Sequence, residues 1–244
     1  FVADFERMTA TVDQMALAMQ SLDGVNQQIG ARVGEVASNA SGAAATMQDA
    51  SHRVDEVRLA TEELQGVLAG FRTGGTPFDA LVDATTVLRE EVLACLKRHA
   101  GGGANVFDQS YQPIAQSDPP RFTTSYDRIV ERDLQILFDR VLTDLPGAAY
   151  ALAVDNRGFA PTHNTKFSRP PNGQREHDLV YCRNKRIFDD PVGIRLAKNR
   201  EPFLLQTYLR DTGEVINDLS MPVILDGKHW GAVRIGYDSA RMIG

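Results

Sequence analysis

The sequence predicts an α+β protein in which a long coiled-coil helix precedes a globular domain with a five-stranded antiparallel sheet flanked by helices. Three observations predict this fold: a heptad repeat of apolar residues at the start of the chain, a break rich in glycine, and alternating strand patterns after it. The 244 residues therefore divide into a helix over 1–71, a linker over 72–77 and a globular domain over 78–244.

The first segment carries an apolar seam whose steps alternate between three and four residues from Phe1 to Phe71. A strict repeat of 3.5 residues over about ten heptads predicts a helix that supercoils with a partner. At 1.5 Å per residue this helix is about 105 Å long, so it is a rod. The small seam residues Ala40, Ala43 and Ala50 favour close helix packing in a four-helix bundle. We expect the rod to assemble a homodimer.

The second half of the rod has a seam of alanine, valine and methionine, and it ends in Ala60-Thr61-Glu62-Glu63-Leu64 and Leu68-Ala69-Gly70-Phe71-Arg72. These segments resemble the end of the cytoplasmic signalling domain of bacterial methyl-accepting chemotaxis proteins. In that family, paired hairpins form a four-helix bundle whose tip binds a histidine kinase and its coupling protein. The resemblance covers only a returning helix and implies chemotaxis signal transduction with these partners. A plain dimerisation rod is the alternative.

Two amphipathic helices are expected after the linker. Residues 78–99 and 126–145 each carry apolar side chains at helical spacing, and three glycines at 101–103 end the first. Between the helices, residues 111–121 contain three prolines and predict an ordered loop. Each helix has an apolar stripe to bury, so we expect both to flank the sheet.

Strand patterns begin after Pro146. The apolar run 149–154 is followed by the turn 155–158, and residues 159–163 return as its expected hairpin partner. Three later segments predict antiparallel strands joined by tight loops: 203–210, 215–225 and 229–237. Residues 164–202 form a polar excursion between the two groups, with a short helix expected near 194–198. The expected sheet therefore spans 149–237.

Two strands, a long excursion and three further strands resemble the layout of a PAS or Cache sensory domain over roughly 134–237. The most specific parts of the resemblance include Asn184-Lys185-Arg186-Ile187-Phe188 and residues 230–237. Such domains stand behind the signalling helix in some chemoreceptors, which is the order found here. The resemblance implies a small-molecule sensor in which the excursion closes a pocket over one face of the sheet.

The second half of the excursion concentrates cationic side chains: Arg183, Lys185, Arg186, Arg195, Lys198 and Arg200. In a chain of net charge −6 this clustering suits an anionic ligand, because a guanidinium holds a carboxylate through two parallel hydrogen bonds. We expect Arg183 and Arg186 to bind the ligand. A solvated basic loop is the alternative.

The series Tyr181, Arg186 and Phe188 resembles the tyrosine, arginine and aromatic residue by which amino-acid-binding Cache domains hold a carboxylate. Asp189 and Val192 depart from that motif, which has an aromatic residue and an alanine at those positions. The resemblance implies an organic acid or an amino acid as ligand, with Arg186 as the clamp.

Three further residues are candidates for the same pocket. Tyr208 and Asp218 lie on adjacent expected strands, the tyrosine as a wall and the carboxylate as an acceptor for an amine or hydroxyl. His163 ends the first expected hairpin. It is a candidate for a hydrogen bond to the ligand or, as in some PAS-like domains, for binding haem. Each of the three has a purely structural role as its alternative.

Composition and motifs exclude several functional classes. The net charge of −6 argues against nucleic-acid binding, and no run of 18 apolar residues predicts a membrane span. We therefore expect a cytoplasmic protein, which leaves open a membrane anchor in a longer parent chain.

Catalytic and metal motifs are also missing from the sequence. Cys95 and Cys182 stand in no metal or redox motif. His177 and His229 have no partner at metal-ligand spacing. No phosphate-binding loop or nucleophile elbow occurs. The expectation is a protein that is not an enzyme and holds neither metal nor cofactor. An interaction module without a small-molecule ligand is the alternative from another class.

Overall fold

The computed structural model describes residues 2–69, 75–210 and 213–238. The chain divides into two compact units, Phe1–Thr61 and Glu62–Gly244. The last seam position, Phe71, and residues 72–74 of the expected linker lie outside the described residues. None of the described helices is both long and apolar enough to cross a membrane.

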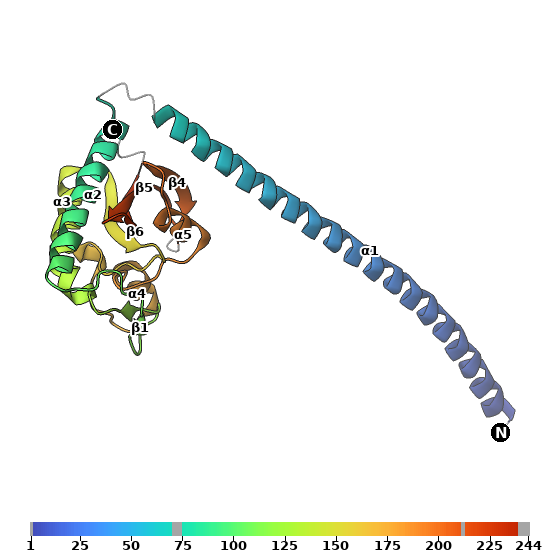
Figure 1. The fold of residues 1–244 in the computed structure, drawn as a ribbon. Helices are drawn as coiled ribbons and strands as arrows, with labels where there is room; N and C mark the ends of the chain where they lie inside the picture. Colours follow the sequence, from blue (N-terminus) through green and yellow to red (C-terminus); the bar gives the residue numbers. More distant parts are fainter. Residues whose placement is uncertain (1, 70–74, 211–212, 239–244) are drawn as a thin grey trace. The chain divides into compact units, whose positions relative to one another are not determined.

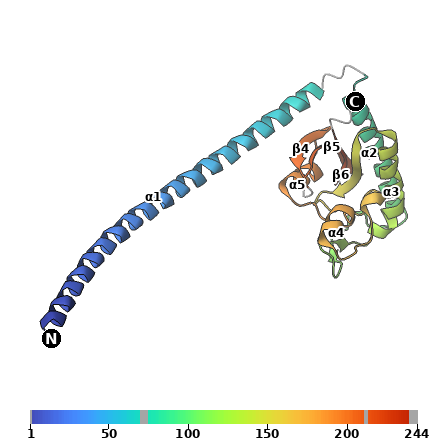
Figure 2. The ribbon, with the colours of Figure 1, turned by 180° about the vertical axis from the view of Figure 1, so that it is seen from behind.

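The first unit holds most of α1, a single helix over Val2–Ala69 that Figure 2 shows without a sharp kink. Large apolar seam side chains with described burial, such as Met8, Ile29 and Val36, are 53–67% exposed in the single chain. Helices that bury no apolar face gain little from tertiary packing, so packing within the single chain contributes little to the stability of α1.

The second unit is built on a four-stranded antiparallel sheet in the order β3-β6-β5-β4 (Figure 1). Its strands are β3 (Ala148–Asp155), β4 (Leu204–Leu209), β5 (Val215–Leu225) and β6 (Lys228–Tyr237). A separate two-stranded sheet pairs β1 (Gln112–Pro113) with β2 (Phe122–Thr123). The α+β class is therefore confirmed.

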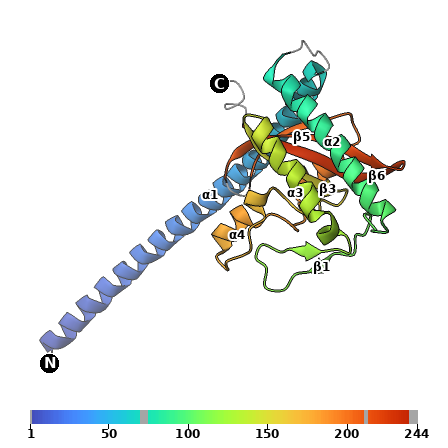
Figure 3. The same ribbon diagram turned by 90° about the vertical axis from the view of Figure 1, so that its left-hand side faces the viewer.

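Two helices, α2 (Pro77–Gly101) and α3 (Asp127–Asp144), lie side by side across one face of the sheet (Figure 3). A capping box begins α2: the Asp79 amide donates to the Thr76 hydroxyl at 3.1 Å, and the Thr76 amide donates to the Asp79 carboxylate at 3.1 Å. The apolar stripes of both helices are buried against the sheet, where Leu88, Phe138 and Trp230 are among the buried core residues. These helices occupy the two ranges that carried helical spacing in the sequence.

The expectation of five strands in one sheet is wrong, because residues 159–163 do not return along β3. The Ala160 amide donates to the Arg186 carbonyl at 2.9 Å, and the Lys185 amide donates to the Ala160 carbonyl at 2.8 Å. The Asn164 side-chain oxygen accepts the Ala151 amide at 2.8 Å and so takes a hydrogen bond on the outer edge of β3. This segment therefore pairs with the excursion instead of the sheet.

The excursion contains three short helical elements: η1 (Thr165–Phe167), α4 (Arg175–Tyr181) and α5 (Pro191–Ala197). The expected helix near 194–198 begins earlier, since Asp190 caps it by accepting the amides of Val192 at 3.1 Å and Gly193 at 3.0 Å. The seven-residue α4 was not predicted. Of these elements, α5 contacts β4, β5 and β6, and together with residues 186–190 it lies over the sheet face that the long helices leave open.

Candidate ligand-binding site

A cavity of about 360 Å³ lies between the sheet and the excursion. Among the described residues, five of the predicted site residues line it: His163, Arg183, Arg186, Phe188 and Tyr208. The excursion supplies one wall, and β3, β4 and β6 supply the other. The structure therefore brings together predicted residues from three separate stretches of sequence, near 163, 183–188 and 208.

The sheet wall is built on a buried ion pair between Arg234 of β6 and Asp218 of β5. The Arg234 Nε lies 3.0 Å from the Asp218 Oδ2, and the Nη2 donates to the same oxygen. Tyr150 and Tyr208 also donate their hydroxyls to this Oδ2, at 2.6 and 3.2 Å. Opposite charges and four donor atoms from three residues compensate the burial of the carboxylate.

Asp218 itself lies behind the cavity and is not among its described lining residues. Its Oδ2 is occupied by protein donors, and its buried Oδ1 has no hydrogen-bond partner in the described part of the chain. From the sequence, this carboxylate was expected to accept a hydrogen bond from an amine or a hydroxyl of the ligand. In the structure, Asp218 orients Arg234, Tyr150 and Tyr208, and these three residues line the cavity.

Gly236 explains how Tyr150 reaches across the sheet. A Cβ atom at Gly236 would lie 2.2 Å from carbon atoms of the Tyr150 ring, closer than any real contact. The ring therefore lies against the bare backbone of β6, and a glycine is required there.

His163 is a buried, neutral residue of the cavity lining. Its Nδ1 accepts the Asn164 amide at 2.8 Å, which leaves the proton of the neutral ring on Nε2. Burial, and then the guanidiniums of Arg183, Arg210 and Arg234, hold the pKa of His163 well below its ordinary value. The imidazole is therefore a neutral hydrogen-bond donor at pH 7, close to three cations.

The excursion wall presents two arginines around one aromatic ring. The guanidiniums of Arg183 and Arg186 each lie 5.4 Å from the centre of the Phe188 ring. Both also donate to the Leu179 carbonyl, at 3.1 and 3.5 Å. These contacts orient the two planar cations at the cavity.

The other predicted residues of the excursion lie elsewhere. Tyr181 packs against Arg169, whose guanidinium lies 4.3 Å from the ring centre, and it is not among the described lining residues. Lys185 is buried and bonds Asp127 of α3 at 2.6 Å. Lys198 belongs to a second hollow, away from this cavity. The cationic residues that cluster in the sequence therefore do not form one group in the structure.

Sequence reasoning missed Tyr150, Arg210 and Arg234. Arg210 follows β4, pairs with Glu214 at 3.0 Å and lies 5.3 Å from the centre of the Tyr150 ring. Arg234 is the one charged residue in the segment 230–237 of β6, and a lone arginine among apolar residues could have indicated a functional role. The sequence did not indicate a role for Tyr150 in the site, because an aromatic residue in an apolar run is expected to be part of the hydrophobic core.

The lining as a whole suits an anion with an apolar body. Four guanidiniums, two tyrosines and a neutral histidine provide donors, while Leu152, Ile187 and Phe188 provide apolar surface. Two carboxylates, Asp189 and Asp190, also line the cavity, and the second is engaged in capping α5. Sites of this kind recognise carboxylates by charge-assisted hydrogen bonds.

No protein-family model and no curated protein sequence matches the chain. Among solved structures, one similar chain is an extracellular ligand binding receptor from Desulfohalobium retbaense, with a TM-score of 0.32 and 17% sequence identity. The match covers 65% of this chain and 25% of that chain. This chain thus spans about a quarter of that receptor, and so low a TM-score does not establish a common fold.

Proposed function

We propose that the second unit is a cytoplasmic sensor domain that binds a small carboxylate-bearing molecule and relays its binding to a helical signalling bundle in chemotaxis. The observation that carries this proposal is the cavity between sheet and excursion, with Arg183, Arg186, Arg210 and His163 in its lining. An enzymatic activity or a resident cofactor is not part of the proposal.

The chemistry of the lining supports a carboxylate. Arg183 and Arg186 are oriented by the Phe188 ring and the Leu179 carbonyl, so little side-chain freedom is lost when a carboxylate binds them. His163 adds a neutral donor that does not compete for protons near pH 7. An organic acid or an amino acid fits this set.

Contacts of the excursion with α3 offer a route for the signal. Lys185, next to the clamp residue Arg186, bonds Asp127 at the start of α3 at 2.6 Å. Asp139 near the other end of α3 accepts the Thr165 amide at 3.0 Å and the Asn164 side chain at 3.3 Å. A ligand that favours one position of the excursion thereby favours one position of α3, provided its affinities for the two states differ.

The route continues from α3 to α2, which follows the linker in sequence. Asp133 bonds both Arg98 and His99, and Arg140 bonds Glu91. In this proposal the seam of α1 forms a homodimer, and the bundle acts on a chemotaxis histidine kinase through its coupling protein. An interaction module without a ligand and a haem sensor are the competing functions, and haem at His163 predicts a coloured protein with a Soret band.

The test measures the thermal unfolding midpoint of the full chain in the presence of organic acids, amino acids and purines, one compound at a time. A ligand at 100 times its dissociation constant adds about 2.7 kcal/mol and raises the midpoint by several degrees. We expect a shift with carboxylates, its loss in Arg186→Ala, and its retention in Arg128→Ala, which removes an exposed arginine on α3. No shift with any compound, in a colourless protein, would favour the interaction module.

A further inference from the structure

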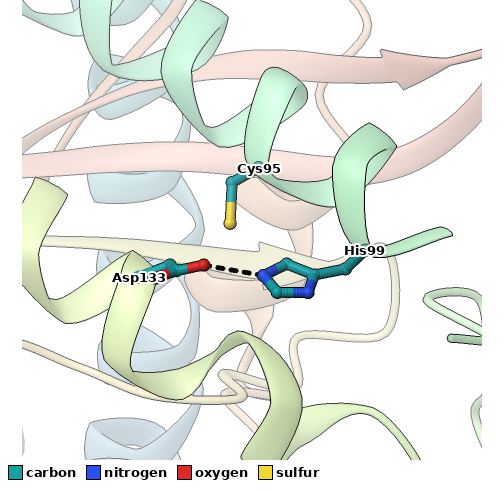
Figure 4. Close-up of side chains that lie close together, drawn as sticks. All are labelled: Cys95, His99 and Asp133. Carbon is teal, nitrogen blue, oxygen red and sulfur yellow. Dashed lines mark hydrogen bonds and ion pairs between the residues drawn. The ribbon is translucent and has the colours of Figure 1, made fainter. Parts of the chain in front are cut away.

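A second cluster of side chains lies between α2 and α3, away from the cavity. Cys95 and His99 are one turn apart on α2, and Asp133 faces them from α3 (Figure 4). One ligand atom from each residue lies within 4.8 Å of the other two. The His99 Nε2 is 2.7 Å from the Asp133 Oδ2. Figure 4 shows the three side chains converging on the space between the helices.

The donor set and its surroundings fit a zinc ion. A thiolate, an imidazole and a carboxylate are all ligands that Zn²⁺ accepts, and three protein ligands leave the fourth position for water. Residues four apart on a helix lie on one face, which lets Cys95 and His99 bind the same ion. Cys95 is 3% exposed, whereas the side chains of His99 and Asp133 are 20% and 38% exposed. The cluster is therefore buried on one side and open to an entering ion on the other.

We propose that Cys95, His99 and Asp133 form a Zn²⁺ site that joins α2 to α3. Binding releases the proton of the Cys95 thiol to water and forms bonds to the ion from the sulfur, from an imidazole nitrogen of His99 and from a carboxylate oxygen of Asp133. Because the ligands come from both helices, the ion holds the helix pair together.

Arg98 is the competitor for this site. Its guanidinium lies 2.6 Å from the Asp133 Oδ2 and 3.9 Å from the Cys95 Sγ, so it supplies the positive charge that the ion would supply. The Arg98 side chain is 63% exposed and can withdraw into solvent. Removing this arginine should therefore tighten metal binding.

A second cluster with the same donor types, His177, Asp178 and Cys182, provides a natural comparison. Its carboxylate accepts the backbone amides of Asn172 at 3.0 Å and Gly173 at 3.2 Å. These amides cannot leave without opening the loop, whereas Asp133 is held by side chains alone. The Cys95 cluster is therefore the one that can rearrange around an ion.

The experiment is a Co²⁺ titration of the full chain after metal removal by a chelator. Tetrahedral cobalt bound to a thiolate absorbs in the visible and has a sulfur-to-metal band in the near ultraviolet, and Zn²⁺ should abolish both by displacement. We expect these bands in the wild type and in Cys182→Ser. Their absence from the wild type, or their loss in Cys182→Ser with retention in Cys95→Ser, would overturn the proposal.

Two further variants separate metal binding from folding. His99→Gln should lose the cobalt bands while its metal-free unfolding midpoint shows that the chain still folds. Arg98→Gln should bind Co²⁺ more tightly than the wild type, a gain that no purely structural ion pair predicts. Unchanged or weaker binding in Arg98→Gln, or cobalt bands that persist in His99→Gln, would contradict the proposed ligand set.

Discussion

The hydroxyl of Tyr150 on β3 lies 2.6 Å from the carboxylate of Asp218 on β5, with the whole width of β6 between their backbones. The side chain spans β6 because Gly236 leaves its backbone bare at the crossing point. This contact joins β3, β6 and β5 in one wall of the cavity. A substitution at Tyr150, Asp218 or Gly236 should therefore change the positions of the other two residues.

Gly236→Ala should destabilise the protein and weaken ligand binding. The added methyl group would overlap the Tyr150 ring, which has to move, and overpacking of this kind costs about 1–3 kcal/mol. Denaturant unfolding measures the loss. Gly101→Ala is the matched control, because a Cβ there meets no atom within 4 Å. An equal loss of stability in the two variants would contradict the close contact between Gly236 and the Tyr150 ring.

Removing one partner of the buried ion pair should lower the free energy of unfolding. Removing both should lower it by less than the sum of the two single losses. Asp218→Asn or Arg234→Met alone leaves a buried charge without its partner, which destabilises by about 3–5 kcal/mol. The double variant Asp218→Asn with Arg234→Met should be more stable than the sum of the single effects predicts. Urea unfolding of the four proteins tests this, and strict additivity would show that the pair is not coupled.

Acidification should weaken the fold in part through His163. Its pKa is depressed in the folded state, so below pH 6.5 the unfolded chain binds a proton that the folded chain does not. Stability contributed by the neutral ring is present above pH 6.5 and falls as the pH drops toward the folded pKa, by at most about 1.4 kcal/mol per pH unit. His163→Gln should flatten this dependence between pH 7 and pH 5.

The control for the acid effect is His52→Gln, since His52 is exposed on α1. Both variants and the wild type are unfolded by urea at several pH values. A slope in His163→Gln as steep as in the wild type would mean that other groups account for the acid sensitivity.

The open seam of α1 should drive self-association. Ile29→Lys and Val36→Lys place charges on the seam and should shift the chain from dimer toward monomer in analytical ultracentrifugation. Gln28→Lys adds the same charge off the seam and should leave the dimer intact. A wild-type chain that sediments as a monomer at every concentration would contradict the role of the seam.

Much of the fold was predictable because local patterns carry it. Thr76 and Asp79 form a capping box around Pro77 at the start of α2, and glycines stand at its end. Apolar or alternating segments bounded by turn residues predicted the four strands of the main sheet. The fifth expected strand failed because local alternation does not show a long-range partner: Ala160 bonds Lys185 and Arg186 in place of β3.

The candidate site was predictable only where its residues cluster in sequence. Arg183, Arg186 and Phe188 came from one short segment, whereas Arg234 reaches the same cavity through strand pairing. Cys95 and His99 likewise gave no signal, because their third partner is 34 residues away from His99 on another helix. Such contacts depend on tertiary packing, which periodicity does not contain.

The cavity also has a consequence for binding stoichiometry. Its described lining runs from Tyr150 to Arg234 of one chain, so a single chain carries a complete lining. Calorimetry should therefore find one ligand per chain. A chain too dilute to self-associate should still bind one ligand, and its dissociation constant should differ from that of the associated chain only to the extent that binding and helix packing are coupled.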